Sequence, residues 1–348
     1  MSKITTRYGD GFPVEMTEQK LIADIVAGSE DAADRGKIAP LEQDEIDYLV
    51  DIFKCTHKVV GVDPGNECVL SYDAAPIKLL RANVNADRIQ SLQIYEKLMG
   101  ADTLEMGHTD YSFKPVKPIV GYEEPLMEQA LLVTTAPIFY GAMPNLGLYS
   151  QPDGPFPNPM ELMPAGKIAE SRESYEMAVE EAVKDIVFVS GHLYESGADA
   201  IMLDTVGAAG DADVLASLKA TEILKEKYPD LCVEMGMAGE FIIGLHGDLE
   251  YKGVRLAGLY NHELIKLAQK AGVTIFGPVV NTKTSKSVPW NLARSVTFTK
   301  ACSDIAEIPV HANMGMGVGA VTLNDHPPID VTSRSSKAMV EICRLDGL

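Results

Sequence analysis

The chain has 348 residues, 46% hydrophobic and 23% charged, so it can bury a sizeable core and has the length of one large α/β barrel. Its formal net charge of −20 excludes non-specific nucleic-acid binding, which needs clustered lysine and arginine. The sequence contains no run of about 18 apolar residues and no apolar signal core, which excludes a membrane span and a recognisable secretory signal. The 5 cysteines lack paired spacing, which predicts a reduced, cytoplasmic protein.

The sequence pattern of residues 1–98 predicts a cap made of helices and a hairpin. The stretches 16–36 and 40–55 have the apolar spacing of helices, and Thr17 is placed to cap the first of them. Residues 57–73 predict a β-hairpin that turns at Asp63-Pro64-Gly65-Asn66. We therefore expect residues 1–98 to cap a main domain that spans residues 99–348.

The main domain alternates short apolar strands with helices. Strands are predicted within 102–108, 131–141, 198–207, 231–239, 272–281 and 308–316, and one of the helices spans 212–228. The later strands start at intervals of about 30 to 40 residues, which is the size of a βα repeat. This alternation predicts a parallel sheet.

Polar residues recur at the ends of these strands, beside glycines. In a barrel all strand ends face one site, whereas an open doubly wound sheet concentrates its ligand chemistry at one switch point. The distribution therefore favours a TIM-type (β/α)8 barrel. We count about six strands where a closed barrel needs eight, so we expect the barrel to be incomplete.

Three carboxylates, Asp204, Glu234 and Glu240, are the strongest candidates for chemistry. Gathered at one barrel mouth, they would bind an ammonium group through charge-assisted hydrogen bonds or transfer a proton. The structural alternative is that one or more of them form ion pairs with Lys283, Lys286 or Arg294.

Further candidates come from other strand ends and from one long loop. Glu105 and His108 crowd the end of a strand, so we include them in the catalytic set, although hydrogen bonding at a strand–loop junction explains them equally well. The remaining residues predicted to bind substrate are Tyr140, Asn281, His311 and Asn313. The loop 139–166 is rich in proline and glycine, which predicts an ordered lid or docking surface.

Two motifs lack the context that their usual functions require. The glycine-rich stretch 314–321 looks like a dinucleotide loop, but Asn324, Pro327 and Pro328 follow it instead of a helix. The stretch that starts at His262 has Lys266 where a zinc motif needs a second histidine. We expect no bound metal or cofactor, although a metal site assembled in space from Glu105, His108 and His311 stays open.

The chain resembles the dimethylamine:corrinoid methyltransferases of methylamine-metabolising methanogens and some bacteria. The resemblance is carried by the stretches GADTLEMGHTDYSFKPVKP, FYGAMPNLGLYSQPDGPFPNP, GAAGDAD, GMAGE, FGPVVNTKTSKSVPWNLARSVTF, NMGMGVG and SRSSKAMVEI. The resemblance covers almost the whole chain. It implies transfer of a methyl group from dimethylamine to the cobalt of a cognate corrinoid protein, with release of monomethylamine. The chain has no D-x-H-x-x-G motif, so the corrinoid would be carried by that partner. A homo-oligomer is expected as well, because an incomplete barrel exposes strand edges.

Members of this family carry pyrrolysine, encoded by an in-frame UAG, after Asp-Gly and one aliphatic residue. This chain ends at Asp346-Gly347-Leu348, so the resemblance implies that pyrrolysine would follow Leu348. The chain would then be a truncated and catalytically incomplete product. Two alternatives stay open: a pyrrolysine-free homologue that acts on another small amine, and a non-catalytic protein that docks the corrinoid protein.

Overall fold

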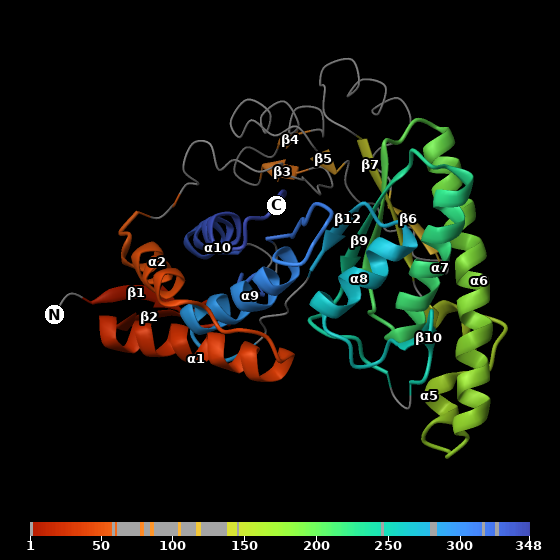
Figure 1. Cartoon of the computed structure of the whole chain (residues 1–348), viewed down its shortest axis with the longest axis horizontal. Helices are drawn as coiled ribbons and strands as arrows, with labels where there is room; N and C mark the ends of the chain where they lie inside the picture. Colours follow the sequence, from red (N-terminus) through yellow and green to blue (C-terminus); the bar gives the residue numbers. More distant parts are fainter. Residues whose placement is uncertain are drawn as a thin grey trace. The chain divides into compact units, whose positions relative to one another are not determined.

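The computed structural model describes most of the chain, and its parts form two compact units (Figure 1). The described residues are 3–57, 60, 77–79, 84–86, 104–105, 116–119, 138–144, 146–244, 247–278, 284–314, 317–323 and 327–348. Unit 1 comprises Met1–Cys68, Tyr260–Ile265 and Gly277–Leu348, and unit 2 comprises Val69–Leu259 and Lys266–Phe276. The boundary predicted after residue 98 and the hairpin predicted at 57–73 fall largely outside the described residues, so both stay predictions.

Unit 1 is built from helices and one short hairpin. Its elements are β1 Ile4–Arg7, β2 Pro13–Met16, α1 Glu18–Gly36, α2 Gln43–Lys54, α9 Val288–Ser303 and α10 Ile329–Glu341. Strands β1 and β2 pair antiparallel. The structure confirms both helices that the sequence predicts before residue 56, whereas it adds the β1–β2 hairpin, which the sequence analysis missed.

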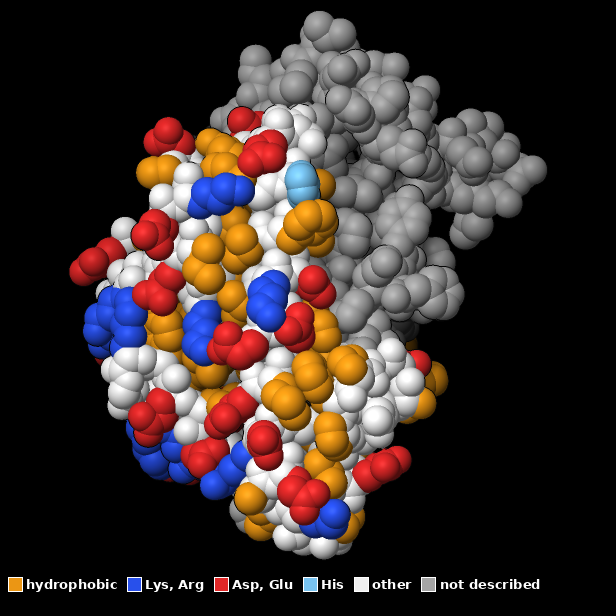
Figure 2. All heavy atoms as spheres, turned by 90° about the vertical axis from the view of Figure 1, so that its right-hand side faces the viewer, with side chains coloured by type: hydrophobic (Ala, Val, Ile, Leu, Met, Phe, Trp, Pro, Cys, Tyr) orange, Lys and Arg blue, Asp and Glu red, His pale blue; other side chains and the backbone are white. Residues whose placement is uncertain are grey.

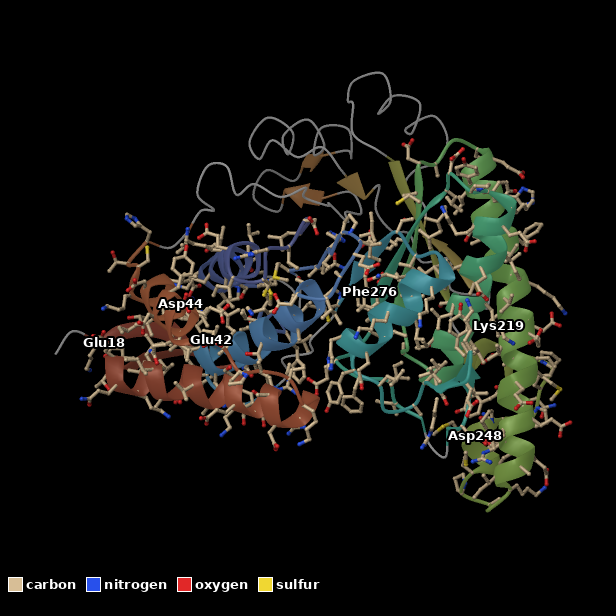
Figure 3. The ribbon with its side chains drawn as sticks, in the orientation of Figure 1. Glu18, Glu42, Asp44, Lys219, Asp248 and Phe276 are labelled. Carbon is tan, nitrogen blue, oxygen red and sulfur yellow. The ribbon has the colours of Figure 1, made fainter. Side chains whose placement is uncertain are left out.

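The starts of the first two helices follow from local chemistry. The Thr17 hydroxyl accepts a hydrogen bond of 3.2 Å from a first-turn N–H of α1, as the sequence predicts. A capping box joins Glu42 and Glu45 at the start of α2. Figure 3 shows Glu18 at the start of α1, and Glu42 and Asp44 at the start of α2. These carboxylates lie where the helix dipole favours negative charge.

Helices α1 and α9 pack closely along much of their length. The hydroxyl of Thr297 in α9 donates to that of Ser29 in α1 over 3.0 Å, and Arg294 forms a 2.9 Å ion pair with Asp31. A Cβ atom at Gly28 would lie 2.1 Å from the carbonyl oxygen of Trp290. The absence of a side chain at this position therefore sets how closely the two helices approach.

Unit 2 contains the parallel sheet, and helix α8 and strand β12 cross from one unit into the other. The strands are β3 Ile77–Leu79, β4 Val84–Ala86, β5 Leu104–Glu105, β6 Val116–Ile119, β7 Ile138–Pro144, β8 Ala200–Val206, β9 Cys232–Met237, β10 Glu250–Tyr251, β11 Val254–Arg255 and β12 Ile275–Gly277. The helices are the 3-10 helix Leu146–Tyr149, α5 Pro159–Leu162, α6 Ile168–Glu195, α7 Asp211–Lys227 and α8 Asn261–Ala271.

The main sheet has the strand order β12-β9-β8-β7-β5, with β6 paired to β7. Strands β5, β7, β8 and β9 pair parallel and lie in the order of the sequence, and α6 and α7 fill the connections after β7 and β8. A doubly wound sheet would reverse its strand order, whereas a barrel keeps it. The fold is therefore a TIM-type α/β fold with an incomplete barrel, which confirms the predicted fold class.

Helices α6 and α7 lie side by side against β8 (Figure 1). Lys219 of α7 forms a 2.9 Å ion pair with Glu180 of α6. On the face that Figure 2 shows, acidic, basic and apolar side chains are interspersed. None of the helices in the described part of the chain combines the length and the apolar content that a membrane span requires.

We expect Gly28→Ala to lower the free energy of unfolding by about 1–3 kcal/mol. Alanine is favoured over glycine inside a helix by about 1 kcal/mol, but here its Cβ would overlap the backbone of Trp290. Urea denaturation of the two proteins measures the difference.

Ala27→Gly is the matched control, because Ala27 is the exposed neighbour in the same helix. It should cost about 1 kcal/mol through helix propensity alone. A Gly28→Ala variant as stable as the parent would show that α1 and α9 separate easily.

Candidate functional site

Asp204 and Glu234 lie on one face of the parallel sheet. Glu234 of β9 pairs with Met202 of β8, and Asp204 follows Met202 by two residues. Side chains alternate along a strand, so the two carboxylates share a face. A Cβ atom at Gly236 would lie 3.6 Å from Asp204 Oδ1, which directs Asp204 to that same face. Strand spacing and rise place the two Cα atoms about 8 Å apart.

The carboxyl end of β8 contains a β-bulge. The register shifts between Leu203 and Val206, so that Asp204 and Thr205 together lie opposite the single residue Gly236. Thr205 has φ 52°, which is rare for a β-branched residue, and its N–H donates to Asp204 Oδ1 over 2.7 Å. Bulges and strained backbone concentrate at functional sites, where they orient a side chain.

Glu234 is a buried acid, with 1% of its surface exposed. Glutamate is almost never fully buried unless it is paired. Its charge reaches the neighbouring Cys232: burial raises the pKa of that thiol, a hydrogen bond from Thr274 lowers it, and the negative charge of Glu234 raises it.

The third predicted carboxylate, Glu240, lies in the loop that follows β9 and is half-buried. This loop starts against β8, because the N–H of Ala238 donates to Val206 O over 2.8 Å. Glu240 therefore follows the same carboxyl edge of the sheet as Asp204.

Two of the predicted residues that the structure describes belong to unit 1. His311 is buried and forms an isolated parallel bridge with Gly347, and the N–H of Ala312 donates to Gly347 O over 3.2 Å. Asn313 follows in a loop and is half-buried. Their meeting with the carboxylates of unit 2 stays a prediction.

For two of the other predicted residues the structure gives only the strand pairing of the backbone, and two more lie outside the described residues. Glu105 of β5 pairs with Phe139 of β7, and Tyr140 of β7 pairs with Ile201 of β8. His108 and Asn281 lie outside the described residues.

Two of the cations that the sequence analysis named as alternative ion-pair partners of the carboxylates make contacts inside unit 1. Arg294 pairs with Asp31 over 2.9 Å, and Lys286 Nζ lies 5.9 Å from the centre of the Trp290 ring. Lys283 lies outside the described residues.

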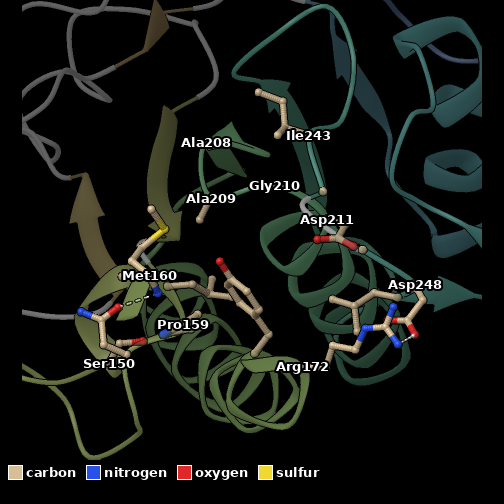
Figure 4. Close-up of a pocket in the computed structure, with 17 residues that line it drawn as sticks. Ser150, Pro159, Met160, Arg172, Ala208, Ala209, Gly210, Asp211, Ile243 and Asp248 are labelled. Atoms are coloured by element: carbon tan, nitrogen blue, oxygen red, sulfur yellow. Dashed lines mark hydrogen bonds and ion pairs between the residues drawn. The ribbon is translucent and has the colours of Figure 1, made fainter. Parts of the chain in front are cut away.

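A cavity of about 400 Å³ lies in unit 2, where the loops after β7, β8 and β9 meet the first turns of α6 and α7 (Figure 4). The sequence analysis did not find this cavity, although the stretches GAAGDAD and NLGLYSQPDGPFPNP supply much of it. Its lining residues are Leu146, Gly147, Ser150, Asn158, Pro159, Met160, Arg172, Tyr175, Ala208, Ala209, Gly210, Asp211, Ile243, Gly244, Gly247, Asp248 and Leu249.

Part of the predicted lid forms one wall of this cavity. The N–H of Gln151 donates to Phe156 O over 2.7 Å, and the Tyr149 hydroxyl donates to Asp185 of α6 over 2.5 Å. Ser174 of α6 donates to the carbonyl oxygen of Pro157 over 2.6 Å. These contacts hold residues 149–157 together and against α6, and the role of the loop as a lid or docking surface stays a prediction.

Asp213 joins two of the loops around the cavity. This fully buried carboxylate accepts a hydrogen bond of 2.5 Å from the N–H of Ala209 in the β8–α7 loop, and another from the N–H of Leu146 after β7. Burial raises its pKa to about 7, although both hydrogen bonds favour the charged form. Burial therefore disfavours the ionised form of Asp213 by more than the two N–H donors stabilise it.

Metal ligands do not gather in the part of the chain that the structure describes. Across those residues, no three His, Cys, Asp or Glu side chains lie in a group that could hold a metal ion.

The raised pKa of Asp213 predicts that stability falls as pH rises from about 4 to about 7. In this window the folded state holds a proton that the unfolded state, with an ordinary carboxyl pKa, has released. Asp213→Asn removes this dependence, so its stability relative to the parent should rise by about 2–3 kcal/mol between pH 5 and pH 8. Urea denaturation across this range measures the difference.

Asp230→Asn, at an exposed position of the same unit, is the control and should keep the pH dependence of the parent. A constant difference between Asp213→Asn and the parent at every pH would contradict the raised pKa.

Over residues 2–348 the sequence matches the family described as dimethylamine methyltransferase (Dimeth_PyL). Among solved structures, inosine 5' monophosphate dehydrogenase from Legionella pneumophila is 12% identical, with 70% of this chain and 50% of that chain covered and a TM-score of 0.31. The GH53 catalytic domain of Ignisphaera aggregans is 10% identical, with 73% and 70% covered and a TM-score of 0.39. This chain thus spans half the length of the dehydrogenase, and neither likeness bears on function. The family match covers nearly the whole sequence, and the chain belongs to the dimethylamine methyltransferase family.

Proposed function

We propose that this chain provides the substrate-binding scaffold of a methyltransferase that moves a methyl group from dimethylamine to the cobalt of a corrinoid protein. Family membership supports dimethylamine as the methyl donor. The absence of a D-x-H-x-x-G motif from the sequence supports a separate protein as the carrier of the methyl acceptor. The products are the methylated acceptor and monomethylamine.

The main support for this proposal is that Asp204 and Glu234 lie on one face of the parallel sheet. Dimethylamine is protonated at neutral pH and presents two N–H donors. Carboxylates accept such donors through short, charge-assisted hydrogen bonds. The pair can therefore hold the nitrogen and leave the two methyl groups unbound.

The different burial of the two carboxylates suggests different roles. Glu234, at 1% exposure, is suited to hold the ammonium charge in a site from which water is excluded. Asp204 is half-buried at the strand end and can exchange a proton with solvent. The C–N bond breaks during transfer, and a proton kept on nitrogen lets the product leave as a neutral amine rather than an anion.

The bulge at Asp204 and Thr205 supports this assignment. It turns the strand at the edge where the active sites of TIM-type enzymes lie, and Gly236 leaves space beside Asp204. A methyl acceptor would approach the bound amine from this edge.

The pyrrolysine expected after Leu348 is tested by the source gene itself. A UAG codon followed by further open reading frame would support it, and a UAA or UGA codon would contradict it. The expected homo-oligomer is tested by sedimentation of the purified protein.

We expect Glu234→Gln, made in the catalytically active protein, to lower dimethylamine turnover by about 100-fold or more. Glutamine keeps the size of the side chain but removes the charge that binds the ammonium group. Dimethylamine-dependent methylation of the corrinoid protein, followed spectroscopically, measures turnover.

Glu226→Gln is the matched control, because Glu226 is exposed on α7 and the variant makes the same chemical change. It should leave turnover unchanged. Parent-like turnover by Glu234→Gln would remove Glu234 from the site and leave the proposal without its main support.

A further inference from the structure

The outer surface of α6 carries an exposed aromatic side chain. Phe188 lies in the C-terminal half of this helix and is 66% exposed. Its ring stands edge-on to the ring of His192, one turn later, with 4.4 Å between the ring centres. Figure 2 shows apolar side chains among charged ones on the side of the molecule where α6 lies. Single exposed apolar residues are common on protein surfaces, so Phe188 has significance only together with its surroundings.

A groove of about 420 Å³ adjoins the Phe188 ring and is lined by residues of both α6 and α7. Val187 and Gly191 of α6 contribute to it, as do Ile223, which is 42% exposed, and Tyr228, which follows α7. A Cβ atom at Gly191 would lie 3.2 Å from the Tyr228 hydroxyl oxygen, and the real glycine leaves the helix surface low at this level. The same surface thus presents a protruding ring and an apolar recess.

A surface with both features can bind a second copy of itself. In a dimer with two-fold symmetry the same patch of both copies meets, so each protrusion must find its recess within that patch. The order of residues along α6 meets this requirement for an antiparallel pair. The pairs Phe188 with Gly191 and Lys184 with Glu195 have the same midpoint, which lies between residues 189 and 190.

This midpoint fixes the register of the pair. Phe188 lies one and a half residues, or about 2 Å along the helix axis, from it. The Phe188 rings of two antiparallel copies would therefore lie beside each other, and each ring would come level with Gly191 of the other copy. Aromatic rings at such a spacing stabilise an interface through offset or edge-on contact.

The charges beside Phe188 fit the same register. Lys184 lies one turn before Phe188 and Glu195 lies two turns after it, and both are exposed. Antiparallel pairing would bring Lys184 of each copy to Glu195 of the other, so the attraction would occur twice. Complementary charges of this kind fix the register of an interface.

The partners of these charges within the chain leave them available to a second copy. Lys184 pairs with Glu181 over 2.7 Å, and Lys227 Nζ lies 3.6 Å from Glu195. All four side chains are at least 43% exposed, and exposed ion pairs contribute little energy. The two lysines also balance the two glutamates, whereas the whole chain has a net charge of −20. A second copy can therefore approach here without the repulsion that the acidic chain produces elsewhere.

We propose that two copies of this chain associate through the α6 face, which comprises Lys184, Phe188, Gly191, His192 and Glu195. The two α6 helices run antiparallel, and Phe188 of each copy covers the helix surface at Gly191 of the other. The contact consists of helix faces, so it differs from the strand edges that an incomplete barrel exposes. It does not rest on the proposed function.

Sedimentation velocity of the purified chain, over about a hundredfold range of concentration, tests the proposal. We expect a dimer, or a larger assembly that contains it, and we expect Phe188→Glu to reduce the sedimenting mass to about half. The variant would place two carboxylates beside each other at the centre of the contact. Because Phe188 is exposed in the single chain, the variant should keep a thermal unfolding curve like that of the dissociated parent. Phe12→Glu, the same change at a residue of unit 1 that is 70% exposed, is the control and should leave the mass unchanged.

A charge exchange tests the register. Lys184→Glu alone and Glu195→Lys alone would each place like charges opposite one another twice, so each should raise the Kd of the dimer about tenfold or more. The double variant with both substitutions recreates the pairing with its signs exchanged and should associate as the parent does. Lys167→Glu is the control, because Lys167 forms a similar ion pair with Glu170 over 3.2 Å but lies at the start of α6, outside the α6 face.

The outcomes separate this contact from others. An assembly that weakens in Phe188→Glu and in both single charge variants, and recovers in the double variant, supports the α6 face. A parent that is monomeric at every concentration overturns the proposal. An assembly that Phe188→Glu leaves intact also overturns it, because the copies would then meet through another surface. Failure of the double variant to recover overturns the antiparallel register and with it the proposed contact.

Discussion

The register between β8 and β9 is the constraint on which the candidate site depends. Met202 opposite Glu234 fixes which residues share a face, and Asp204, two residues after Met202, lies on that same face at the bulge. A slip of one residue would move Glu234 to the opposite face of the sheet. Leu203, Val233 and Met235 are fully buried, so such a slip would also remove apolar side chains from the core. Core packing therefore protects the position of the carboxylates.

Beyond the strand ends, the geometry depends on buried polar contacts between loops. Asp213 accepts hydrogen bonds from the loops after β7 and β8, and the N–H of Asp211 donates to Ile243 O in the loop after β9 over 3.0 Å. Gly244 and Gly247 let that loop approach Asp211, since a Cβ atom at either would overlap neighbouring atoms. The start of α7 thus organises the three loops that form the cavity. The same contacts that hold the loops also bury charge there.

The sequence predicts best where the signal is periodic and long. Helices α1, α2 and α7 and strands β8 and β9 lie where their apolar patterns place them. The hairpins β1–β2 and β10–β11 were missed because strands of two to four residues carry little pattern and depend on their tertiary setting. Strand β6 was missed for another reason: Pro118 within it is typical of a loop, yet proline is tolerated at a sheet edge.

The candidate site was predictable only in part. Acidic residues at strand ends led to Asp204 and Glu234, whose shared face follows from the register. Nothing in the residue types at 204–205 predicts a bulge or a positive φ at Thr205, because both depend on the pairing with β9. The cavity escaped notice because its walls come from loops that are far apart in the sequence. The stretch GAAGDAD contains the feature that could have indicated the cavity, namely two acids at the start of a helix. Such acids usually indicate only helix capping.

Electrostatics connects the carboxylate pair with its proposed ligand. Two like charges separated by about 8 Å, which is the spacing of the two Cα atoms, repel each other by about 2 kcal/mol at the effective dielectric constant of about 20 that suits protein sites. The net charge of −20 does not place them there, because exposed acids are screened by water and salt. The fold instead holds Asp204 and Glu234 together through β-pairing that their own charges oppose. Under the proposed function, a cation bound between them reverses the sign of this interaction, so their mutual repulsion becomes a preference for the protonated amine over neutral molecules of the same shape.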